Sequence, residues 1–297
     1  MNTIDVLALL ARAEELLELS DTAGARACFT RVLSADAAHV RARHGLGLCF
    51  EAERRDEEAL AAYEAALVDA PDDPGVLFSA ASTCHRLGLL DDADVRYRRV
   101  LGFVPDHVMA LTNLGALSLV RGDHAGARSA LERAVACDPG SEAAWRNLVT
   151  VLERADDPHA LGRCLEDAVA RVPESIALRY RLALHLLGRG DAASARTVFE
   201  SVTALDPSCF EAHYRAGQLD LAGGDAQAAA PRLAAACRLR PDSPAAANDL
   251  GVAHWLLGDR DGARVCFTHA LSVAADYAPA RNNLDALDHE AETAQAG

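Results

Sequence analysis

Lysine is absent from this chain of 297 residues, so all 29 of its basic side chains are arginines. This absence excludes Schiff-base chemistry on lysine and the phosphate-binding lysine of a P-loop. Basic residues are also outnumbered, because 44 acidic side chains leave a formal net charge of -15. Since contacts to phosphate groups need a basic surface, this charge argues against a general nucleic-acid binder and against binding to anionic membranes.

Aromatic residues are few, at 5% of the chain, whereas hydrophobic residues of all kinds make up 51%. Because much of this apolar content is alanine and leucine, the composition favours helices in a folded, soluble protein. Long apolar runs are missing: the longest stretch without a charge, residues 107–120, has 14 residues and is too short to span a bilayer. The N-terminus carries Asp5 where a signal peptide has a basic residue. We therefore expect a cytoplasmic protein.

Sequence motifs that carry chemistry are missing as well. The eight cysteines lie at least 21 residues apart and form no Cys-x-x-Cys pair, so we expect reduced, mostly buried thiols. The chain has no HExxH, GxSxG, GxGxxG or GxxxxGK motif, and its eleven histidines are scattered. We therefore predict no catalytic residue, no metal site and no cofactor, and hence that the chain is not an enzyme.

What the sequence does contain is a period of 34 residues. Six prolines recur at that interval: Pro71, Pro105, Pro139, Pro173, Pro207 and Pro241. Two apolar patterns at helical spacing precede each proline, and a short turn separates them. One register fits along the chain, with a template of Leu114, Gly115, Ser118, Ala127, Leu131, Ala134 and Pro139. The same register gives Leu46, Gly47, Phe50, Ala59, Tyr63, Ala66 and Pro71. The sequence therefore predicts helical hairpins in tandem.

With this register the chain resembles the tetratricopeptide repeat family, whose pattern is Trp-x2-Leu-Gly-x2-Tyr, then Ala-x3-Phe, then Pro. Trp145 and Leu148 match the first part of that pattern. The resemblance implies an all-α, right-handed solenoid of eight repeats. We expect a lead-in at residues 1–5, repeats over residues 6–277, and a last segment, residues 278–297, made of a polar capping helix at residues 279–289 and a frayed tail at residues 292–297. The repeat boundaries are 6–39, 40–73, 74–107, 108–141, 142–175, 176–209, 210–243 and 244–277.

Small residues and turn signals support this register independently of the family. Alanine stands at the twentieth position of seven repeats, and glycine or alanine at the eighth position lets the paired helices approach closely. Gly-Asp at several turns, such as Gly122-Asp123, joins a C-terminal glycine to an N-cap acid. No single hairpin buries both of its faces, so stability is expected to come from stacking neighbours.

In the family, the first helix of each repeat lines a concave groove, and the resemblance implies where groove residues lie. Rings, guanidinium groups and amides at those positions suit an extended peptide that carries carboxylates. We expect the peptide-binding groove to contain Arg146, Asn147, Arg154, Tyr180, Arg181, Tyr214, Arg215, Gln218, Asn113, Asn248 and Trp255.

The charge distribution is compatible with such a ligand. Residues 1–73 carry 7 arginines against 15 acids, for -8, and residues 210–297 carry 7 against 12, for -5. The middle of the chain, residues 74–209, carries 15 against 17 and is nearly balanced at -2. An alternative is that Arg181 and Arg215 only pair with neighbouring acids such as Glu153 and Glu211.

Known groove types of the family match only in part. Of the carboxylate clamp of chaperone-binding members, Asn147 and Arg181 fit successive positions, whereas Thr112, Ala116 and Ala177 depart from it. Of the asparagine ladder of the O-linked N-acetylglucosamine transferases, Asn113, Asn147 and Asn283 are present and five other positions are interrupted. Neither match identifies a ligand.

Three functional hypotheses follow, and fold cannot choose among them. The leading one is a bacterial, non-enzymatic adaptor that binds an acidic or carboxylate-bearing segment of a protein partner in the groove. The second is a self-assembling scaffold, which makes the chain a homo-oligomer. The third is an accessory subunit that presents substrate to a separately encoded enzyme. The bacterial source is inferred from the arginine-rich and alanine-rich composition alone.

Overall fold

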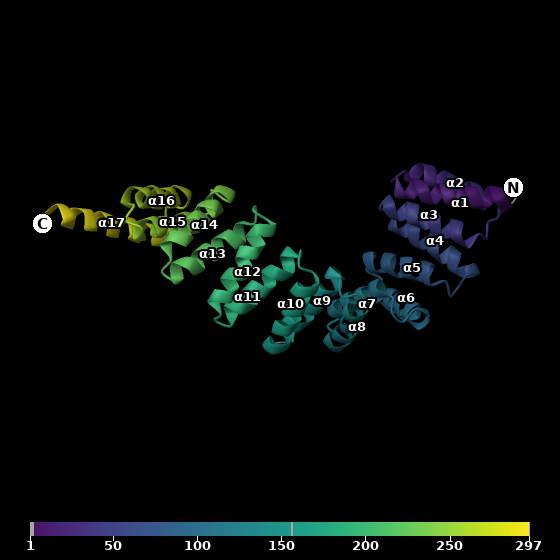
Figure 1. Ribbon diagram of the computed structural model, residues 1–297. Helices are drawn as coiled ribbons and strands as arrows, with labels where there is room; N and C mark the ends of the chain where they lie inside the picture. The colour runs from purple at the N-terminus through teal and green to yellow at the C-terminus, as the bar shows by residue number, and fades with distance from the viewer. Residues whose placement is uncertain (1–2, 156, 297) are drawn as a thin grey trace. The chain divides into compact units, whose positions relative to one another are not determined.

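The structure, a computed structural model, describes residues 3–155 and 157–296, and the side chains of residues 5–155 and 157–290. All regular structure in the described residues is α-helical, which confirms the predicted fold class. The chain divides into two compact units, residues 1–156 and residues 157–297, and each is described by itself. Figure 1 shows the helices of each unit following one another in chain order as antiparallel pairs.

Unit 1 contains four helical pairs and the first helix of a fifth. Its helices are α1 (Thr3–Glu18), α2 (Thr22–Ala35), α3 (Val40–Ala52), α4 (Asp56–Asp69), α5 (Pro74–Arg86), α6 (Leu90–Phe103), α7 (Val108–Val120), α8 (His124–Cys137) and α9 (Glu142–Arg154). Unit 2 begins with the second helix of that pair. Its helices are α10 (Pro158–Arg171), α11 (Ile176–Gly188), α12 (Ala192–Leu205), α13 (Phe210–Ala222), α14 (Ala226–Leu239), α15 (Pro244–Leu256), α16 (Arg260–Val273) and α17 (Ala278–Ala296).

The 34-residue period sets where the helices begin and end. First helices begin at residues 40, 74 and 108 in unit 1 and at 176, 210 and 244 in unit 2. Six second helices end two residues before one of the periodic prolines, as α8 does before Pro139. The reason is that proline disfavours the helical conformation of the residue in front of it.

Contacts between helices repeat in the same way. Within each unit, second helices pack on their own first helix and on the next one, as α4 does on α3 and α5. Neighbouring first helices also touch: α3 contacts α5, α5 contacts α7, α13 contacts α15, and α15 contacts α17. Within each unit the first helices therefore lie side by side, and we call the surface that they form the first-helix face of that unit.

Small residues make the close packing possible. The alanines at the twentieth repeat position are completely buried: Ala25, Ala59, Ala93, Ala127, Ala195, Ala229 and Ala263. A Cβ added to Gly251 in α15 would lie 2.5 Å from the ring of Phe267 in α16, so the backbone of α15 sits directly on that ring. The buried surface of each pair is continuous with that of its neighbours, as expected for stacked repeats.

Helix N-termini are capped by side chains in most repeats. Asp225, for example, accepts a hydrogen bond from the backbone N–H of Ala228 at the start of α14. His39 and His107 act in the same way through Nδ1, at the starts of α3 and α7. These two histidines, which lie at repeat ends, therefore satisfy backbone donors that a helix start leaves unpaired.

The ends of the chain differ in detail from the expected boundaries. Helix α1 begins at Thr3, inside the segment expected as a lead-in, and residues 1 and 2 of that segment lie outside the described residues. Helix α17 spans Ala278–Ala296 and is longer than the expected capping helix, while residue 297 of the expected tail lies outside the described residues. Ala280 and Leu287 of α17 are buried in a cluster with Phe267 and Ala247. Exposed Asp285 and Glu290 make the helix polar elsewhere.

Candidate functional site

The eleven expected groove residues all lie on first helices, and they fall into two separate sets. Unit 1 holds Asn113 on α7 together with Arg146, Asn147 and Arg154 on α9. Unit 2 holds the seven others: Tyr180 and Arg181 on α11, Tyr214, Arg215 and Gln218 on α13, and Asn248 and Trp255 on α15. The expected groove residues are therefore divided between the two first-helix faces.

In unit 2, three of these residues form a hydrogen-bonded cluster. Gln218 Nε2 donates to the Tyr214 hydroxyl at 2.8 Å and to Asp249 Oδ2 of α15 at 3.0 Å. Arg215 Nη1 donates to Gln218 Oε1 at 3.3 Å. Burial raises the pKa of Tyr214, and the neighbouring Asp249 carboxylate raises it further, so the phenol stays protonated. Gln218 thus holds both a ring and a guanidinium in place.

Tyr180 lies beside this cluster. Its ring meets Phe199 edge-on, with the ring centroids 5.7 Å apart. Burial raises the pKa of the Tyr180 phenol, and the Arg215 guanidinium acts in the opposite direction. The two tyrosines and Arg215 therefore combine apolar ring surface with a positive charge on neighbouring helices.

Glu211, the acid that the alternative interpretation of the sequence paired with Arg215, does not neutralise the charge of Arg215. Glu211 instead pairs with Arg240 at 2.6 Å, and the Arg240 guanidinium lies 3.8 Å from the centroid of the Phe210 ring. Among the side chains that the structure describes, no carboxylate forms an ion pair with Arg215, which is exposed. The alternative in which Arg215 pairs with Glu211 is therefore wrong.

Asn248 and Trp255 also form hydrogen bonds that connect α15 to α17. Asn248 is only 6% exposed; its Nδ2 donates to Asp249 Oδ1 at 3.2 Å, and its Oδ1 accepts from Asn283 Nδ2 at 2.9 Å. Trp255 Nε1 donates to Glu290 Oε2 at 3.2 Å. Between the two helices is a hollow of about 490 Å³, lined by Val252, Trp255, Leu256, Asn283 and Glu290.

In unit 1, Asn113 is half-buried, and its Nδ2 donates to the Tyr97 hydroxyl at 3.1 Å. This bond joins α7 to the preceding pair, so the amide is engaged within the protein. Arg146 and Arg154 are exposed on α9, and Asn147 is half-buried.

Comparison with known proteins connects this architecture to a family. The sequence model of the tetratricopeptide repeat family matches residues 10–74, 78–142, 163–208, 180–230 and 214–267, which together make up most of the chain. The chain belongs to the tetratricopeptide repeat family. Tetratricopeptide repeat proteins bind protein or peptide partners, and their fold is typically non-catalytic.

Solved tetratricopeptide repeat structures share the fold. PilF of Pseudomonas aeruginosa aligns with a TM-score of 0.61 and 14% identity, over 73% of this chain and 97% of that one. YrrB, described as having an unusual peptide-binding site, aligns with a TM-score of 0.52 and 22% identity, over 63% of this chain and 96% of that one. At these identities the likeness establishes the fold alone.

A curated relative is the human protein O-mannosyl-transferase TMTC1, which is 27% identical over 143 residues. The match covers 47% of this chain, and the chain spans only about 16% of the length of that relative. The mouse protein of the same name matches at 28% identity over 151 residues.

The structure also contains a polar cluster that sequence reasoning missed. Asp220 on α13 is 1% exposed and forms ion pairs with Arg232 and, at 3.2 Å, with Arg196. Glu200 pairs with the same two arginines. The repeat register offered a signal, because Asp220 occupies the position of the buried Leu16, and Arg232 the position of Cys28.

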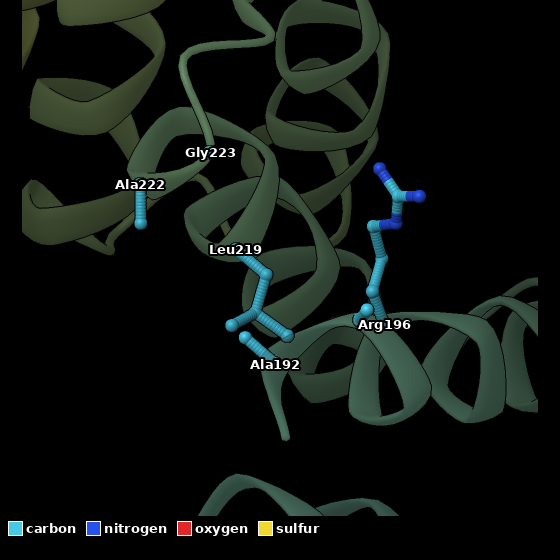
Figure 2. A pocket seen from close by; sticks show the side chains of 6 residues that line it. Ala192, Arg196, Leu219, Ala222 and Gly223 are labelled. Carbon is cyan, nitrogen blue, oxygen red and sulfur yellow. The ribbon is translucent and has the colours of Figure 1, made fainter. Parts of the chain in front are cut away.

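Arg196 of this cluster also borders a cavity of about 330 Å³ between the start of α12 and the end of α13. Figure 2 shows the side chain of Leu219 directed toward Ala192, while the Arg196 guanidinium extends away from Leu219. The cavity is therefore bordered by short apolar side chains together with the stem of Arg196.

Candidate metal ligands are not gathered in the described part of the chain. No three His, Cys, Asp or Glu side chains there are grouped as metal ligands. The eight cysteines are free thiols, and burial raises the pKa of Cys49 and of Cys237 to about 11, which keeps both protonated at neutral pH. No helix among the described residues is long and apolar enough to cross a membrane.

Proposed function

We propose that this tetratricopeptide repeat protein is a non-enzymatic adaptor that binds an extended, acidic segment of a partner protein on the first-helix face of unit 2. The observation that carries the proposal is the state of Arg215. Its guanidinium is exposed and is oriented by the neutral amide of Gln218, while the nearby Glu211 is paired with Arg240. A guanidinium oriented by an amide keeps its charge and further N–H donors for a carboxylate of the partner.

Neighbouring side chains add selectivity for an extended segment. Tyr180 and Tyr214 supply ring surface near Arg215, and Arg181 has the same repeat position on α11 that Arg215 has on α13. Aromatic rings bind apolar parts of a peptide, whereas arginine binds its carboxylates. The four expected residues of unit 1, Asn113, Arg146, Asn147 and Arg154, are not required by this proposal and remain sequence predictions.

The test is selection of binding peptides from a phage library of random 12-residue sequences, panned on the full chain. We expect enrichment of Asp and Glu in the selected peptides, and binding that weakens as salt is raised. In Arg215→Gln the acidic peptides should bind about tenfold more weakly, since one charged hydrogen-bond partner is lost. Arg238→Gln, which removes an exposed arginine of the second helix α14, is the matched control and should bind normally. Selected peptides without acidic enrichment, or equal binding to Arg215→Gln, would contradict the proposal.

A further inference from the structure

The hollow between α15 and α17 belongs to the same first-helix face as Arg215, and its chemistry differs from that of Arg215. Val252, Trp255 and Leu256 give it an apolar lining from α15, and Leu256 is 63% exposed. Its volume of about 490 Å³ is well above the roughly 150 Å³ of a cavity that accommodates a benzene-sized guest. There is therefore space for one large apolar side chain.

Charge at the hollow is balanced by the protein itself. Glu290, at the rim, accepts hydrogen bonds from Trp255 Nε1 and from Arg260 Nη2, each at 3.2 Å. Arg260 forms an ion pair with the same carboxylate. Because the Glu290 charge already has a cationic partner, and because burying a further charge is costly, the complementary occupant is an uncharged apolar group.

Asn283 supplies an orienting group. Its Nδ2 donates to Asn248 Oδ1 at 2.9 Å, which fixes the amide at the wall of the hollow. Its Oδ1 accepts no hydrogen bond from the side chains and backbone that the structure describes. That oxygen can accept a backbone N–H of a bound segment beside the apolar side chain.

The distance from Arg215 to the hollow follows from the order of the first helices. Arg215 lies on α13, and the hollow lies between α15 and α17, which follow α13 on the same face. Packed helices are about 8–10 Å apart, so one and a half spacings are about 12–15 Å. An extended chain rises about 3.3 Å per residue, so roughly four residues cover that distance.

We infer that the hollow between α15 and α17 binds one large apolar side chain of the same acidic segment, three to five residues away from the carboxylate that binds Arg215. The inference rests on the proposed function and adds a second, apolar requirement to it. The ligand is thus a bipartite segment of a partner protein, with one acidic and one apolar anchor at a fixed separation.

The test uses the peptides that the full chain selects from the random 12-residue library. We expect Leu, Ile, Met or Phe to be enriched three to five residues from the enriched acid. Replacing that apolar residue by Ser should weaken binding to the wild-type chain about tenfold and should have little further effect on binding to Leu256→Ser. Leu257→Ser, which changes the adjacent leucine, 45% exposed and outside the lining, is the matched control and should bind as the wild type does.

The outcomes separate this inference from the proposed function. If acidic residues are enriched without a spaced apolar residue, or if Leu256→Ser still discriminates apolar from Ser peptides, the inference is wrong and the proposed function stands. If acidic peptides are not selected, both are wrong. If light scattering shows an oligomer that Leu256→Ser converts to a monomer, a second copy of the chain occupies the hollow and the inference is overturned.

Discussion

Arg86 in unit 1 and Arg215 in unit 2 lie on first helices of the same repeat fold, yet only Arg86 forms ion pairs with carboxylates of the described residues. Arg86 on α5 binds Asp56 at 2.8 Å and Glu51 at 2.7 Å, so two carboxylates occupy its guanidinium. Arg215 on α13 donates to the neutral Gln218. Arginines on a first-helix face are therefore not equivalent, and the neighbouring repeat decides whether such a charge stabilises the protein or is available to a ligand.

One turn of unit 1 differs in a related way from the turns of unit 2. In unit 2, Gly224 adopts a positive φ of 80°, and Asp225 then caps α14. In unit 1, Arg54 adopts a positive φ of 61°, and Arg55 gives α4 no side-chain cap. The turn at Arg54 thus keeps the left-handed geometry with a residue poorly suited to it, because packing between helices stabilises the conformation.

The largest effect is expected at the buried ion pairs of unit 2. Asp220→Leu removes the buried carboxylate from Arg232 and Arg196 and should lower the free energy of unfolding by about 3 kcal/mol. Hydrogen exchange of the amides of α13 and α14 measures the local loss. The double variant Asp220→Leu with Arg232→Cys copies the pair Leu16 and Cys28 of the first repeat, and should recover most of the stability. A double variant no more stable than the single one would show that the ion pairs do not account for the loss.

Substitution of Arg86 should have a smaller effect on stability, and substitution of Arg215 should affect peptide binding instead. Arg86→Gln gives up its ion pairs with Asp56 and Glu51 and should destabilise α4 and α5 by about 1 kcal/mol, without changing the binding of acidic peptides. Arg215→Gln should leave stability within about 0.5 kcal/mol of the wild type and weaken that binding. Thermal unfolding and peptide titration of both variants make the comparison. If Arg215→Gln proved the less stable of the two, Arg215 would be a structural residue.

A substitution at the turn that contains Arg54 in unit 1 should increase the stability of the protein slightly. Arg54→Gly removes a side chain from a left-handed backbone conformation and should stabilise the protein by about 0.5–1 kcal/mol. The reverse change, Gly224→Arg in unit 2, should destabilise by a similar amount. Denaturation midpoints of the two variants measure both effects, and equal midpoints would mean that the turn conformation carries no cost in either unit.

The smallest difference is expected in the acid range. Hydrogen bonds from Arg86 lower the pKa of Asp56 below its ordinary value, so the ionised pair stabilises the folded state above the pKa of the unfolded chain. That contribution is lost as pH falls through the lowered pKa. Between pH 5 and pH 2 the stability of Arg86→Gln should therefore decline less steeply than that of Arg215→Gln. If the stability of the two variants declined equally steeply with pH, Arg86 would not lower the pKa of Asp56.

Sequence periodicity predicted most of the fold because it reflects local physics. The prolines end the second helices, the aspartates cap the helices that follow the turns, and the buried alanines mark where helices touch. Each of these signals acts within a few residues along the chain. The helical class, the register and the identity of the first helices could therefore be read without coordinates.

The partner of each polar side chain could be identified only from the tertiary structure. Among the expected groove residues, Asn248 and Trp255 form hydrogen bonds with Asn283 and Glu290 of α17, and Asn113 forms one with Tyr97. Glu211, which the alternative interpretation paired with Arg215, pairs with Arg240 instead. By itself the sequence determined where helices form and which side of each is buried, because those properties follow from local periodicity. Only the packing between helices decided how charges on different helices are paired, as in Glu211 with Arg240, because such an ion pair depends on the distance between side chains in space.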